Sequence, residues 1–323
     1  MMHPDHLPVP SRGQRALSVA VRVVEFPLLR LAWTLLLFTG GMWLLNALFG
    51  PRSNITLDGS ARRALVATLS LWATVRVLEG KTLGQAVGLS LRRAPRELAF
   101  GLLVGGGLIC LAVGVLTILG DYRIEGLGDG ADAGYLGQIL LLAICVAVAE
   151  EVLSRGILLR LLEQGLGSWA ALVLSAGLFG FAHLGNRGGT VLTSVAIAVE
   201  GGILFGAAYL AVRSLWLPIG MHIAWNYFEG PLLGTPVSGN IVPAFFRTSI
   251  GGPTWLTGGG FGPEAGVPVF ILGTAAGAAA LVLAARRGQM STPRWLSRIL
   301  RRARRVPPPP AVPGPAAAAP PLS

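Results

Sequence analysis

Residues 140–162 read LLLAICVAVAEEVLSRGILLRLL. The stretch is long enough to cross a bilayer, because a transmembrane helix needs about 20 mostly apolar residues. Glu150, Glu151 and Arg155 interrupt it, and ionisable side chains inside a span cost about 2.5–3.5 kcal/mol each on insertion scales. Charged residues at this depth indicate a functional site or a buried ion pair.

The composition of the whole chain is that of a membrane protein. Of its 323 residues, 53% are hydrophobic and 13% are charged, whereas soluble domains carry about 25% charged residues. The apolar runs are rich in Leu, Ala and Gly and do not alternate with polar residues, which argues against an outer-membrane barrel. We therefore predict an all-α, polytopic transmembrane bundle.

About eight apolar stretches are predicted to span the bilayer, namely 31–50, 64–80, 98–119, 137–162, 168–183, 190–212, 214–229 and 267–286. The loop at 81–97 and residues 286–287 are basic, whereas the loop at 120–135 is acidic. Because positive charge favours the cytoplasmic side, this pattern places both termini in the cytoplasm, although three arginines at 51–63 go against it. The Gly-rich loop at 230–266 is then external and is expected to pack on the bundle or the membrane surface.

The net charge of +11 comes almost entirely from arginine. These arginines flank apolar runs, so they are predicted to fix topology in a cell membrane. The lipid bilayer is the expected partner, and nucleic acid is not.

The chain is expected to have three parts. Residues 1–30 form a cytoplasmic tail, residues 31–287 form the transmembrane domain, and residues 288–323 form a C-terminal tail. The basic segment 289–305 is interpreted either as an amphipathic helix on anionic lipid or as a solvated stretch. The Pro- and Ala-rich segment 306–323 is expected to be disordered.

Three short motifs carry the other polar residues deep in the predicted spans. They are EEVLSR (150–155), FGFAH (179–183) and HIAWN (222–226). In each, two polar or aromatic residues stand four apart and therefore project from one face of a helix. Depths counted at about 1.5 Å per residue allow the three motifs to meet in one cavity.

Together these side chains are sufficient to hydrolyse an amide bond. A carboxylate in a low-dielectric site can act as a general base near neutral pH. With one histidine it can deprotonate a water, while a second histidine and an amide donate hydrogen bonds to the oxyanion. Arg155 is expected to neutralise Glu151 and to leave Glu150 as the reactive carboxylate. Each pair taken alone is equally consistent with a structural ion pair or a packing histidine.

Four further charged residues are predicted to have other roles. Arg160, Glu163 and Arg213 lie near span ends and are expected to anchor the helices at the membrane interface. Glu200 is interpreted either as a cavity-lining carboxylate or, preferably, as a buried, hydrogen-bonded acid.

The three motifs, in this order on successive helices, resemble the signatures E-E-x-x-x-R, F-x-x-x-H and H-x-x-x-N of the CPBP family. This family includes the CAAX prenyl proteases of the Rce1 type and bacterial bacteriocin-processing or self-immunity proteins. The resemblance covers about residues 85–285. It implies an intramembrane endopeptidase with a catalytic cavity within the membrane, reached from the cytoplasmic side.

Carried over residue by residue, the resemblance implies that Glu150 is the general base and that His183 is its partner on the water. His222 and Asn226 match the oxyanion-stabilising pair. The Glu–Arg pair of the first motif, Glu151 with its arginine, matches the supporting members.

The need for a metal stays open at this point. Family members are often called metalloproteases, and Glu150, His183 and His222 would hold a zinc ion if one is present. The chain lacks the helical zinc signature H-E-x-x-H, and an amide oxygen is a poor zinc ligand. A metal-free glutamate mechanism explains Asn226 better.

The expected substrate is a membrane-associated peptide or protein, either a prenylated CAAX peptide or a leader peptide or bacteriocin. The main alternative is a non-proteolytic scaffold or bacteriocin self-immunity protein on the same fold. A transporter is the third hypothesis, but the internal repeats and broken helices typical of transporters are not apparent.

Overall fold

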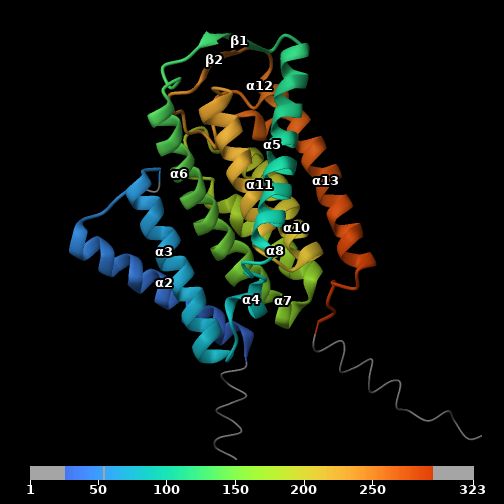
Figure 1. Ribbon diagram of the computed structural model, residues 1–323. Helices are drawn as coiled ribbons and strands as arrows, with labels where there is room; N and C mark the ends of the chain where they lie inside the picture. Colours follow the sequence, from blue (N-terminus) through green and yellow to red (C-terminus); the bar gives the residue numbers. More distant parts are fainter. Residues whose placement is uncertain (1–25, 54, 294–323) are drawn as a thin grey trace, which may run out of the picture.

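The computed structural model describes residues 26–53 and 55–293. Over these residues the chain is a bundle of helices with a two-stranded sheet across one end (Figure 1). The longer helices are α2 (Pro27–Phe49), α3 (Leu57–Ala73), α5 (Ala94–Ile118), α6 (Ala133–Glu151), α8 (Ser168–Ala182), α11 (Trp216–Tyr227) and α13 (Val267–Arg286). The shorter ones are α4 (Leu83–Val87), α7 (Arg160–Leu166), α9 (Val191–Ile197), α10 (Phe205–Val212) and α12 (Thr254–Thr257).

Four π-helical segments interrupt or extend these helices: η1 (Thr74–Leu78), η2 (Val152–Leu159), η3 (Ala198–Leu204) and η4 (Phe228–Leu232). A short 3₁₀ turn, η5 (Pro263–Ala265), precedes α13. Segments η2 and η3 are continuous with the helices on both sides, so 133–166 and 191–212 each form one long rod.

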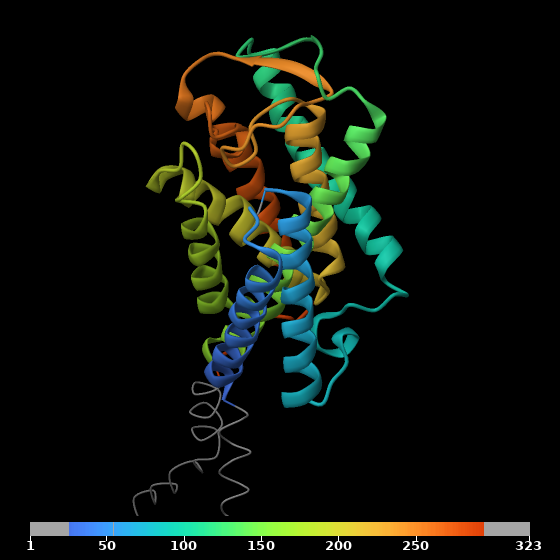
Figure 2. The ribbon, with the colours of Figure 1, turned by 90° about the vertical axis from the view of Figure 1, so that its left-hand side faces the viewer.

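The predicted all-α membrane bundle is confirmed. Within the described residues, five helices are long and apolar enough to cross a membrane: α2, α5, the rod 133–166, the rod 191–212 and α13. The other three predicted spans are also helical, as α3 with η1, α8 and α11, but they fall short of that length or apolarity. Helices α2 and α3 stand at one side of the bundle, as both ribbon views show (Figures 1 and 2).

The expected tails lie largely outside the described residues. Helix α2 begins at Pro27, before the predicted end of the N-terminal tail at residue 30. Of the predicted basic helix at 289–305, only 289–293 is described, and the segment 306–323 is not.

Two close helix contacts hold α11 in place. Glycines at positions 101 and 105 face α11 from one side of α5, as residues four apart do. A Cβ at Gly105 would lie 2.1 Å from the Met221 carbonyl oxygen, and one at Gly101 would lie 2.4 Å from the Leu217 carbonyl oxygen. Small residues let membrane helices approach this closely, and α11 carries His222 and Asn226.

The sheet was not predicted from the sequence. Strand β1 (Tyr122–Leu127) pairs antiparallel with β2 (Phe246–Ile250), so two loops that were expected to be irregular are joined. The Tyr122 hydroxyl, which is fully buried, donates to the Thr257 carbonyl oxygen at 2.7 Å. Burial raises the pKa of this tyrosine, which keeps the hydroxyl protonated as a donor. The sheet thereby fixes the long 230–266 loop against the end of the bundle.

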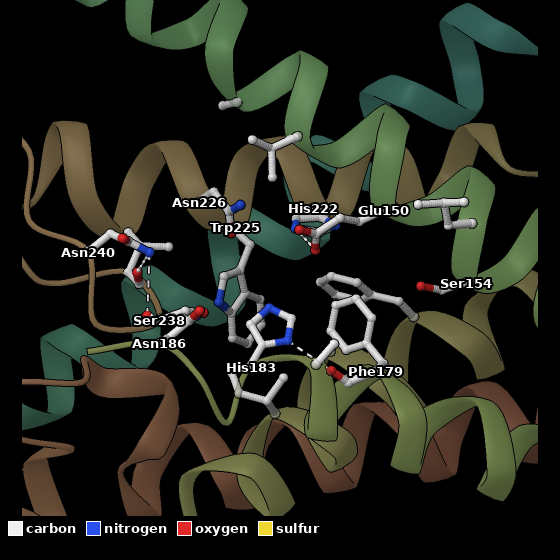
Figure 3. A pocket seen from close by; sticks show the side chains of 18 of the residues that line it. Glu150, Ser154, Phe179, His183, Asn186, His222, Trp225, Asn226, Ser238 and Asn240 are labelled. Atoms are coloured by element: carbon white, nitrogen blue, oxygen red, sulfur yellow. Dashed lines mark hydrogen bonds and ion pairs between the residues drawn. The ribbon is translucent and has the colours of Figure 1, made fainter. Parts of the chain in front are cut away.

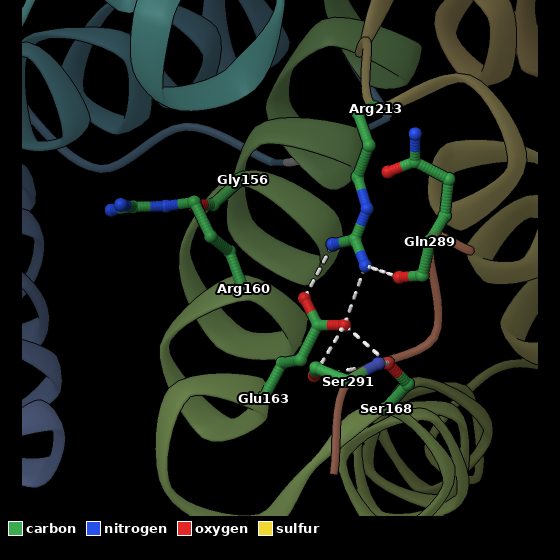
Figure 4. A network of polar contacts seen from close by, with 7 residues as sticks. All are labelled: Gly156, Arg160, Glu163, Ser168, Arg213, Gln289 and Ser291. Atoms are coloured by element: carbon green, nitrogen blue, oxygen red, sulfur yellow. Dashed lines mark hydrogen bonds and ion pairs between the residues drawn. The ribbon is translucent and has the colours of Figure 1, made fainter. Parts of the chain in front are cut away.

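The opposite end of the bundle holds two ion pairs. Arg213, which is half-buried, pairs with Glu163 at 2.5 Å and also donates to the Gln289 carbonyl oxygen (Figure 4). Arg160 pairs with Glu79 at 2.8 Å, and both of those side chains are buried. The prediction of interfacial anchoring is therefore wrong for Arg160 and Glu163, whose side chains are buried against a charged partner, whereas for the partly exposed Arg213 it stays a prediction.

The glycine contact leads to a test of the α5–α11 packing. Replacing Gly105 by Ala forces the two backbones apart, and overpacking of this kind costs about 1–3 kcal/mol. We expect Gly105→Ala to lower the melting temperature of the purified protein in detergent. Gly107→Ala is the matched control, since nothing lies within 4 Å of a Cβ there. Equal melting temperatures for the two variants would contradict the packing described here.

Candidate active site

The three motifs converge on one cavity of about 510 Å³ (Figure 3). Glu150 comes from α6, His183 from the end of α8, and His222 and Asn226 from α11. Figure 3 shows His183 on the opposite wall from Glu150 and His222. The structure thus brings together the four residues that the sequence singled out for water activation and oxyanion binding.

Irregular helix geometry accompanies the site. Segment η2 begins directly after Glu151, and η3 passes behind the cavity with Glu200 on it. π-Helical turns are rare and occur often at functional sites, because they rotate side chains away from the α-helical register. Glu150 lines the cavity, whereas Glu151 is fully buried beside it.

Arg155 forms the expected ion pair with Glu151. The Arg155 Nη1 atom lies 2.8 Å from Glu151 Oε1, and neither side chain is more than 2% exposed. The guanidinium also donates to the carbonyl oxygens of Gly201 and Gly202 in η3, and it lies 4.9 Å from the Phe179 ring centre. Arg155 therefore links η2 to η3 and α8 while it neutralises Glu151.

Glu151 also holds His222, which the sequence did not predict. The His222 Nδ1 atom lies 2.9 Å from Glu151 Oε1, and its Nε2 atom lies 3.9 Å from Glu150 Oε2. Because a carboxylate accepts hydrogen bonds, Nδ1 carries the proton in this contact. The ring is thereby oriented with Nε2 toward Glu150.

His183 is oriented by its own motif. Its Nδ1 atom lies 2.8 Å from the Phe179 carbonyl oxygen, and the two rings are 4.8 Å apart. A carbonyl can only accept, so Nδ1 is the donor and Nε2 of the neutral ring has a free lone pair. The phenylalanine of the motif therefore sets the tautomer and the position of the histidine.

Comparison with known proteins places this segment in a family. Residues 132–228 match the model of the family described as type II CAAX prenyl endopeptidase Rce1-like. This segment is similar to the Rce1-like family. The match spans under a third of the chain and includes all three motifs, and it relates the chain to CAAX-type peptidases at the family level. No curated protein and no solved structure matches the chain.

Two further carboxyl groups, those of Glu200 and Glu264, line the cavity. Glu200 is 2% exposed and has no hydrogen-bond partner for either oxygen among the described residues. The first interpretation of Glu200, a cavity-lining carboxylate, is therefore right, and the preferred one, a hydrogen-bonded acid, is wrong.

Glu264 is the last residue of the stretch GFGPE (260–264), and the sequence analysis did not predict it to be functional. It is 3% exposed, lines the cavity and accepts a hydrogen bond from the Ser238 hydroxyl. Burial raises the pKa of its carboxyl group. Both residues of this contact come from the 230–266 loop, which therefore forms part of the cavity wall.

The donor set does not fit a metal centre. Among the described residues, no three His, Cys, Asp or Glu side chains are grouped so that they could hold a metal ion. We therefore assign no metal ligands to Glu150, His183 and His222.

The buried ion pair can be tested through stability. Removing one partner of a buried pair leaves an uncompensated charge and costs about 3–5 kcal/mol. We expect Arg155→Ala to lower the thermal stability of the purified protein strongly, and Arg155→Lys to rescue it only in part, since lysine lacks the planar fork. Arg247→Ala serves as the control, because its pair with Glu125 is exposed and 3.6 Å long. A loss no larger than that of the control would refute a structural role for the pair.

Proposed function

We propose that this protein is an intramembrane endopeptidase that hydrolyses a peptide bond in its cavity. The observation that carries the proposal is the placement of a carboxylate, Glu150, and a histidine with a free Nε2, His183, on opposite walls of one cavity. A water between them can give up its proton to either group. The similarity of residues 132–228 to the Rce1-like family supports the same reaction.

In the proposed mechanism Glu150 is the general base and His183 assists it. The water oxygen attacks the carbonyl carbon of the peptide while its proton passes to Glu150. The C–N bond then breaks, and the proton is delivered to the leaving amine, so that an acid and an amine are produced. A positioned general base contributes about 10²–10⁴-fold to such a reaction.

The oxyanion is stabilised by His222 and Asn226. Since Nδ1 of His222 donates to Glu151, Nε2 can donate to an oxyanion only when the ring carries both protons. The ring is held by Glu151 at 2.9 Å, with Nε2 directed toward Glu150 at 3.9 Å. Asn226, one turn further along α11, supplies a neutral amide donor. We therefore propose that Glu151 and Arg155 support catalysis by orienting the His222 ring.

The proposed location is the cell membrane, with both termini in the cytoplasm. The described ends of the chain lie at one end of the bundle, together with α4 of the basic 81–97 loop (Figures 1 and 2). The acidic 120–135 loop lies at the other end with β1. This separation of charge supports the orientation. The domain division into 1–30, 31–287 and 288–323 is proposed on the same grounds.

The first test is cleavage of membrane-tethered peptides by the purified protein in lipid. The library contains prenylated CAAX peptides and leader-type peptides, so that it also separates the two proposed substrate classes. We expect Glu150→Gln and His183→Ala to lose at least about 10²-fold in kcat, and Asn226→Ala to lose about 10²–10³-fold. The control is Glu125→Gln, which removes an exposed carboxylate of β1.

If the folded wild-type protein cleaves no member of the library, the scaffold or self-immunity function is favoured. If the wild-type protein cleaves a peptide and Glu150→Gln retains full activity, the peptidase function is supported but Glu150 is rejected as the general base.

A second test concerns the metal. In the proposed glutamate mechanism the base, its partner and the oxyanion donors are all protein groups, so exhaustive chelation should leave cleavage unchanged. Elemental analysis of the active protein should find no stoichiometric zinc. Loss of activity on chelation, restored by added zinc, would overturn the mechanism while leaving the peptidase activity in place.

A further inference from the structure

We propose that Glu200 and Glu264 form a subsite for a cationic group of the substrate, such as a lysine or arginine side chain near the scissile bond. This inference rests on the proposed peptidase function and adds a substrate class to it. It starts from a contrast among the buried carboxylates of the chain.

Three other buried carboxylates are neutralised by arginines of the protein itself. Glu79, Glu151 and Glu163 each pair with an arginine at 2.5–2.8 Å. Glu200 and Glu264 are equally buried, but in the described part of the chain neither has an ion pair with a basic residue. Burying a carboxyl group without a partner is costly. Glu229 is also buried without an ion pair in this part of the chain, but unlike Glu200 and Glu264 it does not line the cavity.

Both side chains face the cavity in which the substrate is proposed to bind. Glu200 uses neither of its oxygens in a hydrogen bond within the described residues. Glu200, Glu264 and His183 line the same cavity, and the charge of Glu264 acts on Glu200. A cation bound in this part of the cavity would therefore be attracted by both carboxyl groups.

The position of Glu264 is fixed by a strained turn. Ser238, which donates to Glu264, has a left-handed backbone with φ of 46°. Its carbonyl oxygen accepts hydrogen bonds from Asn186 at 3.0 Å and from Asn240 at 3.4 Å. Figure 3 shows these three residues together at one end of the cavity, beyond His183 and Asn226 as seen from Glu150. Non-glycine residues held in this conformation cluster at ligand-binding and active sites.

The chemistry of the two groups favours an organic cation. No third His, Cys, Asp or Glu is arranged with them as a metal site among the described residues. Burial raises the pKa of Glu264, and a cation close to its carboxyl group would favour the carboxylate form. An ammonium or guanidinium group on a flexible side chain can reach such a pair and form charge-assisted hydrogen bonds with it.

Arg63 of α3 also lines the cavity. Its positive charge acts on the carboxylate of Glu150. It therefore accompanies the reactive carboxylate and leaves the end of the cavity near Glu264 acidic. A basic side chain of a bound peptide is complementary to that end.

The experiment compares matched peptides. A cleaved parent peptide is varied at each position flanking the scissile bond, with lysine, its uncharged isostere norleucine, or glutamate. We expect one position at which kcat/KM for the lysine peptide exceeds that for the norleucine peptide by about 10–100-fold, the value of a hydrogen-bonded charge. Glu200→Gln and Glu264→Gln should each collapse this ratio, whereas Glu125→Gln should preserve it.

The inference is overturned if wild type shows no such position, or if both glutamine variants keep the ratio. Binding provides a readout that does not depend on hydrolysis: photo-crosslinking of the lysine and norleucine peptides to Glu150→Gln protein. If no peptide is ever cleaved, the peptidase function fails, but preferential capture of the lysine peptide, lost when Glu264→Gln is added, still supports the subsite. Equal capture of both peptides rejects it.

Discussion

The carboxylate of Glu151 is the interaction on which the rest of the site depends. One of its oxygens contacts both Arg155 and His222, at 2.8 and 2.9 Å. A fully buried carboxylate is tolerated only when it is paired and hydrogen-bonded. Arg155 meets that condition, and the same contact lets the carboxylate orient a histidine of another helix. Stability and catalytic geometry therefore share one group.

The adjacency of two glutamates follows from this arrangement. Consecutive residues of a helix point in directions about 100° apart, so Glu150 and Glu151 cannot face the same space. One enters the cavity and the other enters the ion pair behind it. The two carboxylates contact the two nitrogens of the His222 ring from different sides. The pair EE thus separates a carboxylate that lines the cavity from one that is held in an ion pair.

The sequence predicted the bundle and the convergence of the three motifs because both depend on local patterns. Apolar length identified the helices, and four-residue spacing grouped Glu151 with Arg155 and His222 with Asn226. Contacts between segments that are far apart in the sequence could not be predicted from such local patterns. The β1–β2 pairing joins residues far apart in two loops with weak strand character. Likewise, Arg160 and Glu163 looked like interfacial residues because their partners, Glu79 and Arg213, are remote in sequence.

The cavity wall extends beyond the segment that carries the three motifs. Glu150, His183, His222 and Asn226 all lie within the 132–228 segment that matches the Rce1-like family. Much of the remaining lining, including Glu200, also lies in this segment, whereas Leu35 and Phe38 of α2 and the loop residues around Glu264 come from outside it. Reaction chemistry requires a fixed set of groups at fixed positions, whereas substrate choice depends on the surface that surrounds them. In the function proposed above, selectivity would therefore depend on residues from both sides of this boundary, with Glu200 supplied by the matched segment and Glu264 by the long loop at 230–266.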